Sequence, residues 1–388
     1  MTRTFQGYER TGGGAGIRNY VLPISMVHCS NTVAQQIAWK TGTHAITHEY
    51  GCIEFADSHA RTHLALLSAA LNPNVYAVLL VGLGCEQTDH DALMRQIAAS
   101  GRPVAYVGIQ ESGGPAEAVG KGVSIVEAFL REAAAQTRRP IPISKLVLGV
   151  QCGGSDWTTA LSGNAAIGAM TDLLVGQGGS VIISEVAGFP GSEHVLAGRA
   201  ATPQVGLQIL QMCDELRAGY AAAHGQAIEE VNPTPGNKAG GITTLVEKSM
   251  GNVKKMGAVS KIQGLIRAGE TVPHPGLWML DLRAPGIDGN ATSGFAMSGA
   301  HIDVFSTGRG SPLGNVVMPV LKLTGNPQSF REMPSLFDFN AGTALEGAPL
   351  PEVGAALLER VLEIAGGEET RSERNGDFEF IIPRETGR

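Results

Sequence analysis

The stretch "YAVLLVGLGCEQTDH", residues 76–90, changes from apolar to polar at its middle. An apolar run of this length that is followed by glycine and polar residues is typical of a buried strand ending in a turn. The turn presents Cys85 and Glu86 side by side. The stretch "KLVLGVQCGGSD", residues 145–156, repeats the pattern and ends its apolar run at Cys152. Each predicted strand therefore ends at a thiol, which either fills the core or belongs to a site.

Short apolar runs alternate with helical patterns on both sides of residues 76–90. Strands are predicted at 19–30, 44–52, 75–86 and 103–109, and helices at 31–42, 58–74, 89–101 and 115–136. Strands that alternate with helices of this length predict a parallel, doubly wound sheet. The fold class expected for the chain is therefore α/β.

The chain divides into three parts by its sequence pattern and composition. Residues 137–144, "TRRPIPIS", read as a linker, and a second alternating block follows it. Beyond Pro233 the sequence becomes Gly-rich with isolated charges, and one helix is expected near the end. We therefore predict a first α/β block at 1–140, a second at 141–232 and a Gly-rich, loop-heavy region at 233–388. The two blocks are expected to be Rossmann-like, with mostly parallel sheets.

Composition limits the function. The 388 residues are 43% apolar and 17% charged, which is a globular composition, and 52 of them are glycine. A formal charge of −7 gives no basic surface for nucleic acid, so an anionic substrate needs local positive charge. Five cysteines in a chain of this length are not a disulfide framework, and no apolar run is long enough to cross a membrane. The start also lacks the apolar core of a secretion signal, so a reduced cytoplasmic protein is expected.

Four of the five cysteines fall at the ends of predicted strands, where open parallel sheets bind their ligands. Cys213 lies inside an amphipathic helix and is expected in the core. The other four, with nearby histidines, favour a site for iron or zinc, although the close cysteine pairs of structural zinc sites do not occur. Three cysteines that hold an iron–sulfur cluster are the alternative. The four are Cys29, Cys52, Cys85 and Cys152.

Three further positions have both a plain and a functional interpretation. His48 precedes the predicted strand end at Cys52 and is a candidate ligand or base. Lys248 is either a surface residue or, if buried, a base or a partner for a carboxylate. The loop 305–315, "FSTGRGSPLGN", is either a simple turn or an anion-binding nest in which Arg309 grips a carboxylate. The histidine pair at 59 and 63 is interpreted as part of a solvated helix start.

Motifs spread over nearly the whole chain resemble the altronate dehydratase and galactarate dehydratase family, specifically its large catalytic part. They include "GYERTGGGAGIRNYVLPISMVHCS" at 7–30, "QCGGSDWTTALSGNAAIG" at 151–168, "GNKAGGITTLVEKSMG" at 236–251 and "STGRGSPLGNVVMPVLKLTGNP" at 306–327. The resemblance implies a hydro-lyase that removes water from sugar acids to give 2-keto-3-deoxy acids. It also implies dependence on Fe²⁺, with Mn²⁺ as a second candidate.

The resemblance further implies a small β-rich, SAF-like domain, either fused or separate. This sequence begins directly at the catalytic part, so we expect a separate small subunit, and also a homo-oligomer. The chain departs from the family pattern at "SEVAGFPGSEH", 184–194, where Glu185 and Glu193 remain but the motif's second carboxylate is replaced near Gly188. Arg283 is an addition relative to the family pattern and is a candidate to bind an extra anionic group of the substrate. Elimination of sulfite from sulfolactate, on the same scaffold, is therefore the second functional candidate.

Elimination beside a carboxylate needs a base, a cation to stabilise the enediolate and an acid or Lewis acid for the leaving group. His48 or Lys248 is expected to be the base, and Glu86 or Glu185 a metal ligand or acid. The expected metal ligands are Cys29, Cys52, Cys85, Cys152 and His28. The expected substrate-binding residues are Arg18, Asn19, Arg283, Thr307, Arg309 and Ser311. A metal-stabilised subunit without activity and a sugar-acid sensor are the non-enzyme alternatives.

Overall fold

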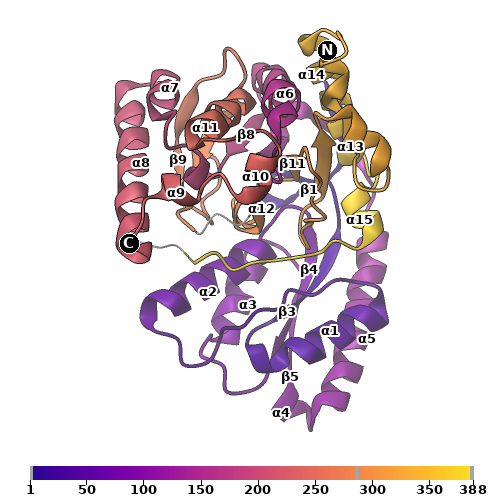
Figure 1. The fold of residues 1–388 in the computed structure, drawn as a ribbon. Coiled ribbons are helices and arrows are strands. Elements are labelled where there is room, and N and C mark those ends of the chain that lie inside the picture. Colours follow the sequence, from indigo (N-terminus) through magenta and orange to yellow (C-terminus); the bar gives the residue numbers. More distant parts are fainter. Residues whose placement is uncertain (1–2, 285–287, 385–388) are drawn as a thin grey trace.

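The computed structural model describes residues 3–284 and 288–384, and it contains two parallel sheets and one antiparallel sheet. Figure 1 shows the smaller parallel sheet, with its helices, below the larger one. The prediction of an α/β fold with doubly wound, mostly parallel sheets is confirmed. In the part of the chain described, no helix is long and apolar enough to cross a membrane.

The smaller parallel sheet has the order β3-β4-β5, which is Tyr20–Ser25, Val75–Gly82 and Val104–Gly108. Its strands are almost wholly apolar because helices cover both faces. One core cluster joins one face to α1 and α5, and another joins the opposite face to α2 and α3. The bounds of these helices, with the short α4, are Asn31–Thr41, Ala56–Ala70, His90–Ala98, Ile109–Ser112 and Pro115–Ala134 for α1 to α5.

The strand predicted at 44–52 does not form, and only Ile46 makes an isolated bridge to Ile24. Side chains occupy the backbone groups that a strand would need. The Asn31 amide donates to the His48 carbonyl oxygen at 2.8 Å, and the Tyr50 N–H donates to the His48 ring at 3.1 Å. These local bonds hold 48–51 as a loop.

The larger sheet has seven parallel strands in the order β13-β12-β11-β7-β8-β10-β9. Crossover connections order a parallel sheet, and here β7 and β8, the two strands of the predicted second block, lie between strands of the predicted third region. Helices α6 and α14 pack together, and α12 lies against β7. The strand bounds are Val147–Cys152 for β7, Ser180–Ile183 for β8, Ile262–Ile266 for β9, Gly276–Leu280 for β10, Ile302–Ser306 for β11, Val320–Thr324 for β12 and Phe339–Asn340 for β13. The domain boundaries at 140 and 232 stay predictions.

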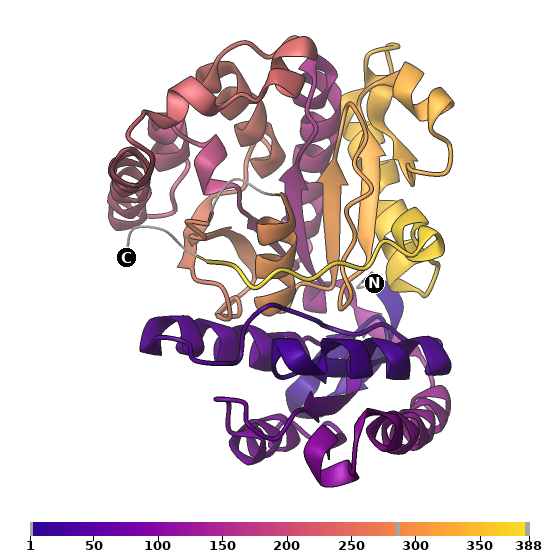
Figure 2. The ribbon, with the colours of Figure 1, turned by 60° about the horizontal axis from the view of Figure 1, so that its bottom comes forward.

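The helices of the larger part surround this sheet, and Figure 2 shows the C-terminal segment running between the two parallel-sheet layers. His44 stacks on Phe378 with ring centroids 3.5 Å apart, so this segment contacts the first layer as well. The helix bounds are Asn164–Gly176 for α6, Glu193–Gly198 for α7, Pro203–His224 for α8, Ile228–Val231 for α9, Pro235–Ala239 for α10, Leu245–Val253 for α11, Asp288–Met297 for α12, Pro327–Glu332 for α13, Leu350–Ala365 for α14 and Arg371–Asn375 for α15.

The predicted linker at 137–144 is instead partly a strand. β6 (Arg139–Pro142) pairs antiparallel with β1 (Thr4–Arg10), and β1 also pairs with β2 (Gly14–Gly16). The prediction was wrong because proline can occupy an edge strand when a distant partner supplies the pairing. Phe5 and Ile141 face each other in this register and are both buried.

Candidate active site

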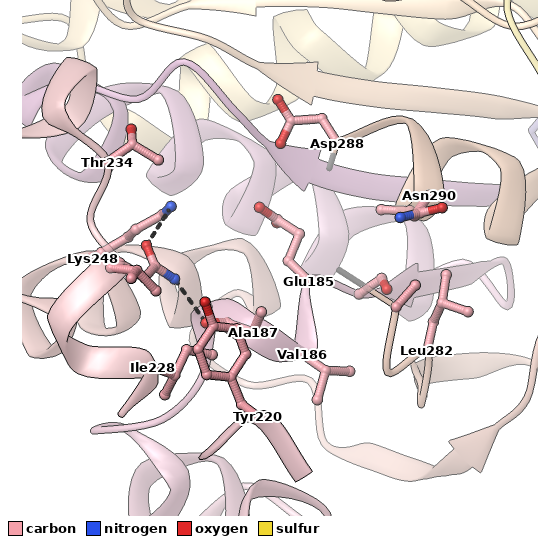
Figure 3. A pocket seen from close by; sticks show the side chains of 16 residues that line it. Glu185, Val186, Ala187, Tyr220, Ile228, Thr234, Lys248, Leu282, Asp288 and Asn290 are labelled. Carbon is pink, nitrogen blue, oxygen red and sulfur yellow. Dashed lines mark hydrogen bonds between the residues drawn. The ribbon is translucent and has the colours of Figure 1, made fainter. Parts of the chain in front are cut away.

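A pocket of about 210 Å³ opens where the chain leaves the carboxyl ends of β8 and β10. This is the edge of a parallel sheet at which ligands bind. Figure 3 shows Glu185, Lys248 and Asp288, which come from three separate segments, pointing toward the same space. Apolar side chains, among them Tyr220 and Leu282, line the rest. The pocket thus combines an apolar wall with a few convergent charged groups.

Glu185 stands on a strained backbone directly after β8. Its φ of 75° is in the left-handed region, which side chains other than glycine rarely adopt. Its Oε2 accepts a hydrogen bond from the Cys152 N–H at 3.0 Å, and Lys255 Nζ forms an ion pair with the same oxygen. The strain therefore aims the carboxylate at the end of the neighbouring strand β7.

Cys152 and Lys255 lie beneath this carboxylate, and both are buried. The Lys255 Nζ is 3.6 Å from the Cys152 Sγ, which is 3.6 Å from Glu185 Oε1. Burial, helped by the charge of Glu185, raises the pKa of the Cys152 thiol. Burial alone would lower the pKa of Lys255, but its interactions with Cys152 and Glu185 outweigh burial and raise that pKa. An ammonium paired with the Glu185 carboxylate is the resulting arrangement.

Asp288, the first residue of α12, faces this carboxylate from the other side of the pocket (Figure 3). It packs over Gly153, where a Cβ would overlap its carboxylate. Burial, followed by the charge of Glu185, raises the pKa of Asp288 to about 6. A carboxyl group with this pKa can exchange a proton near neutral pH.

Thr292 and Asp303 hold the start of α12 in place. The Thr292 hydroxyl donates to Asp303 Oδ2 at 3.0 Å, and Asp303 is wholly buried in β11. Gln151 of β7 donates to the same two side chains. Asp288 is therefore carried on a helix that is tied to two central strands.

Lys248 supplies positive charge to the pocket. Its Nζ donates to Asn232 Oδ1 at 3.0 Å and to Asn237 Oδ1 at 3.2 Å, and both acceptors are neutral. Within the described residues no ion pair joins Lys248 to a carboxylate. Its charge is thus available to an anionic ligand.

His48 and Glu86 lie in the smaller layer and serve its loops. The His48 Nε2 donates to the Ser25 carbonyl oxygen at 2.8 Å and its Nδ1 accepts from Tyr50, so both ring nitrogens are engaged. Burial lowers the pKa of His48. Glu86 accepts from three successive backbone N–H groups at 83–85 and from the Tyr106 hydroxyl. The structure therefore does not bring these two residues to the pocket, and their catalytic roles stay predictions.

Arg18 and Asn19 connect parts of the chain to each other. Arg18 is 8% exposed, and its guanidinium binds both carboxylate oxygens of Glu373, at 2.8 and 3.0 Å, and the carbonyl oxygens of Ile364 and Glu368. Asn19 accepts from Arg10 at 2.8 Å. Neither residue lines the pocket, so their roles in substrate binding stay predictions.

Arg283 and the loop 307–311 lie on other hollows. Arg283 pairs with Asp281 through two bonds of 2.9 Å and also with Glu215. Thr307 is buried and accepts from the Gly310 N–H, and Ser311 accepts from Leu313. Arg309 lines a separate pocket of about 540 Å³ at the carboxyl ends of β11 and β12, and no partner holds its guanidinium within the described ranges.

The four cysteines predicted to form one site separate into three and one. Cys29, Cys52 and Cys85 are exposed on loops of the smaller layer, whereas Cys152 is buried beside Lys255. The Lys255 ammonium contacts both Cys152 and Glu185, and so occupies the place that a metal ion would need between them. In residues 3–284 and 288–384, no three His, Cys, Asp or Glu side chains are placed to hold a metal ion. The residues near Cys152 therefore do not fit a single ion, and Cys213 is buried as expected.

Comparison with known proteins connects this site to a family. The profile of "D-galactarate/Altronate dehydratase, C-terminal" matches residues 143–387, and that of "D-galactarate dehydratase/Altronate hydrolase, second domain" matches residues 7–134. The chain belongs to the galactarate/altronate dehydratase family. The resemblance drawn from the sequence motifs is thereby confirmed.

Three relatives show what the chain is similar to. Altronate dehydratase of Bacillus subtilis is 36% identical over 98% of the chain and 77% of the relative. Altronate dehydratase of Escherichia coli is 33% identical with the same coverage. The beta subunit of (2R)-sulfolactate sulfo-lyase of Chromohalobacter salexigens is 33% identical over 98% of the chain and 97% of the relative. These relatives confirm the prediction that the family member is an enzyme of the lyase class.

Lys255 and Asp288 are the residues of this site that sequence reasoning missed. Lys255 stands in "NVKKMG", 252–257, beside Lys254, and nothing in the letters separates the buried lysine from the exposed one. Asp288 follows Pro285 and Gly286 in the sequence and resembles a loop residue. A signal for Lys255 exists only in its flanks, since Val253 and Met256 are both core residues.

Proposed function

We propose that the chain is a dehydratase that removes water from an aldonate or aldarate to give a 2-keto-3-deoxy acid. The observation that carries the proposal is the placement of Glu185 and Asp288 on opposite sides of one pocket beside Lys248. Two carboxyl groups in different environments, one paired with an ammonium and one without an ion pair among the described residues, suit a base and an acid. The names of the two altronate dehydratases support the sugar-acid substrate class.

The proposed elimination assigns one task to each side chain. Lys248 binds the substrate carboxylate and stabilises the negative charge that grows on it as the C2 proton leaves. Glu185 takes that proton, and the C2–H electron pair forms the C2–C3 double bond. The C3–O bond breaks, and Asp288 gives its proton to the departing hydroxyl, which leaves as water. The resulting enol rearranges to the 2-keto acid.

Lys255 and Cys152 contact Glu185 and hold its carboxylate in place for this reaction. The Lys255 ammonium forms an ion pair with the Glu185 carboxylate, and the Cys152 N–H fixes the orientation of that carboxylate. Iron dependence is a further proposal, supported by the family resemblance. Because the residues around Cys152 do not fit a single ion, every step above rests on protein side chains.

Sulfite elimination from sulfolactate is the second candidate, supported by the relative that matches over 97% of its own length. Sulfite departs with the C–S electron pair and needs no proton. The two reactions therefore make different demands on Asp288. The Asp288→Asn variant is expected to lose dehydration and to keep sulfite release.

We also propose a separate small partner subunit. The support is that one relative is named as a beta subunit, which implies an assembly of more than one kind of chain for that relative. The deciding experiment is an anaerobic substrate screen with Fe²⁺, with and without the co-expressed small partner. It covers aldonates, aldarates and sulfolactate, and it reads 2-keto acid and sulfite together. A 2-keto acid without sulfite supports the dehydratase, whereas no turnover in any arm supports a non-catalytic subunit or sensor.

A further inference from the structure

Three exposed cysteines gather at one edge of the smaller sheet. Cys29 follows β3, Cys85 follows β4, and Cys52 lies in the loop after the bridge at Ile46. Free cysteine is among the most buried residue types, so three exposed thiols at one edge need an explanation other than packing. The two further cysteines of the chain are buried.

Backbone hydrogen bonds tie the three loops together. The His28 N–H, next to Cys29, donates to the Tyr50 carbonyl oxygen at 2.9 Å. The Gln87 N–H, two residues after Cys85, donates to the Gly51 carbonyl oxygen at 3.0 Å. Each cysteine thus stands within two residues of a bond to a neighbouring loop. The cysteines share one edge because the fold links the loops that carry them.

Gly51 makes this approach possible. Its φ is 103°, and a Cβ there would lie 2.5 Å from the Met26 carbonyl oxygen and 2.7 Å from the Val27 Cα. Only glycine fits both the backbone angle and the space. The close approach brings the loop of Cys52 against the segment that leads into Cys29.

The loop around Cys52 also carries strain and exposed apolar surface. Ile53 has a φ of 50°, which is an outlier for a β-branched residue. Ile53 and Phe55 are 94% and 90% exposed, so apolar side chains flank the thiols. The buried Thr88 hydroxyl, three residues after Cys85, has no hydrogen-bond partner among the residues that the structure describes, and such groups often accompany an ion or water.

We propose that Cys29, Cys52 and Cys85 together bind an iron–sulfur cluster at this edge. Ligands of a single ion contact the same atom and must be very close together, and no such group of three exists among the described residues. In a cluster each thiolate binds a different iron, so its cysteines stand further apart. Clusters are commonly held by four cysteines, so three leave one iron open to an oxygen ligand.

The inference goes beyond the proposed dehydration, because cluster binding is measured without turnover. The full chain is incubated anaerobically with ferrous iron and sulfide and is then desalted. Iron, acid-labile sulfide and visible absorbance are measured, and the reduced sample is examined by electron paramagnetic resonance. We expect about four irons and four sulfides per chain for a cubane cluster, with an absorbance that air bleaches.

Cys29→Ser, Cys52→Ser and Cys85→Ser are each expected to lose most of the sulfide while keeping the Tm of the wild type, because all three side chains are exposed. Cys213→Ala is the matched control and keeps the cluster. Iron without sulfide, stoichiometric zinc in its place, or equal sulfide in the variant lacking all three cysteines would each overturn the proposal. Failure of the dehydratase assay would leave these measurements unaffected.

Discussion

Lys255 Nζ lies 3.6 Å from the Cys152 Sγ and forms an ion pair with Glu185, although the lysine side chain has no exposed surface. Removing water from a charged group costs several kcal/mol unless a partner compensates. The Glu185 carboxylate is that partner, and it is also the proposed base. The buried lysine therefore connects the stability of the large sheet to the chemistry of the pocket.

Lys255→Met is expected to lower both stability and activity. The substitution leaves the Glu185 carboxylate without its ion partner, which typically costs about 3–5 kcal/mol for a buried pair. The measurements are chemical denaturation and kcat/KM for the best substrate of the screen. Lys254→Met is the matched control, because its side chain is exposed beside Lys255 and is expected to leave both quantities unchanged. Equal effects of the two substitutions would contradict the assigned role.

Asp288→Asn tests the proposed acid through pH dependence. An acid must be protonated to act, and burial raises the pKa of Asp288 to about 6. The kcat/KM of the wild type should therefore fall as pH rises above about 6, about tenfold per pH unit where this group limits the rate. The variant should be slower by about a hundredfold or more at pH 6 and should lack this decline. A decline that persists unchanged in the variant would assign it to another group.

Arg18→Ala separates structural support from substrate binding. Because the guanidinium is buried against Glu373 and two carbonyl oxygens, its loss is expected to cost about 3–5 kcal/mol of folding free energy. The KM of the folded fraction should not change. A double-mutant cycle with Glu373→Gln should show coupling. A large rise in KM without loss of stability would instead support the substrate-binding prediction.

Arg309→Gln tests the loop at 307–311. Its guanidinium lines the second pocket without a described partner, and the prediction drawn from the sequence is that it holds a substrate carboxylate, tested here as the far carboxylate of an aldarate. The KM for aldarates should rise about tenfold or more, while the KM for aldonates, which lack that carboxylate, should change little. Arg331→Gln, on the nearby α13, serves as the control. An equal change of KM for aldarates and aldonates would contradict the assignment of Arg309 to the far carboxylate.

The strands could be predicted where an apolar run alone determines them. β4 and β7 follow their apolar runs, and Cys152 ends β7 as expected. β6 was missed because its pairing with β1 joins segments more than a hundred residues apart. The strand at 44–52 was wrongly predicted because the side chains of Asn31 and His48 capture the backbone groups that it needs.

The site could be predicted only in part, because it too depends on contacts between segments that are distant in the sequence. Glu185 and Lys248 belong to motifs that can be recognised in the sequence, and both line the pocket. The role of Lys255 depends on complete burial, which a sequence shows only indirectly. The four cysteines were predicted to form one site, but Cys152 lies apart from the other three. It ends β7 of the larger sheet, whereas the others lie at the smaller sheet, and periodicity does not reveal which strands share a sheet.

The most direct test compares wild type and Glu185→Gln in the anaerobic assay for 2-keto acid, with aldonates and aldarates as substrates. Glutamine keeps the size of the side chain but cannot accept the C2 proton. We predict that wild type forms the 2-keto acid and that the folded variant loses at least about a hundredfold in kcat. Equal rates of 2-keto acid formation by the two proteins would contradict the assignment of this pocket.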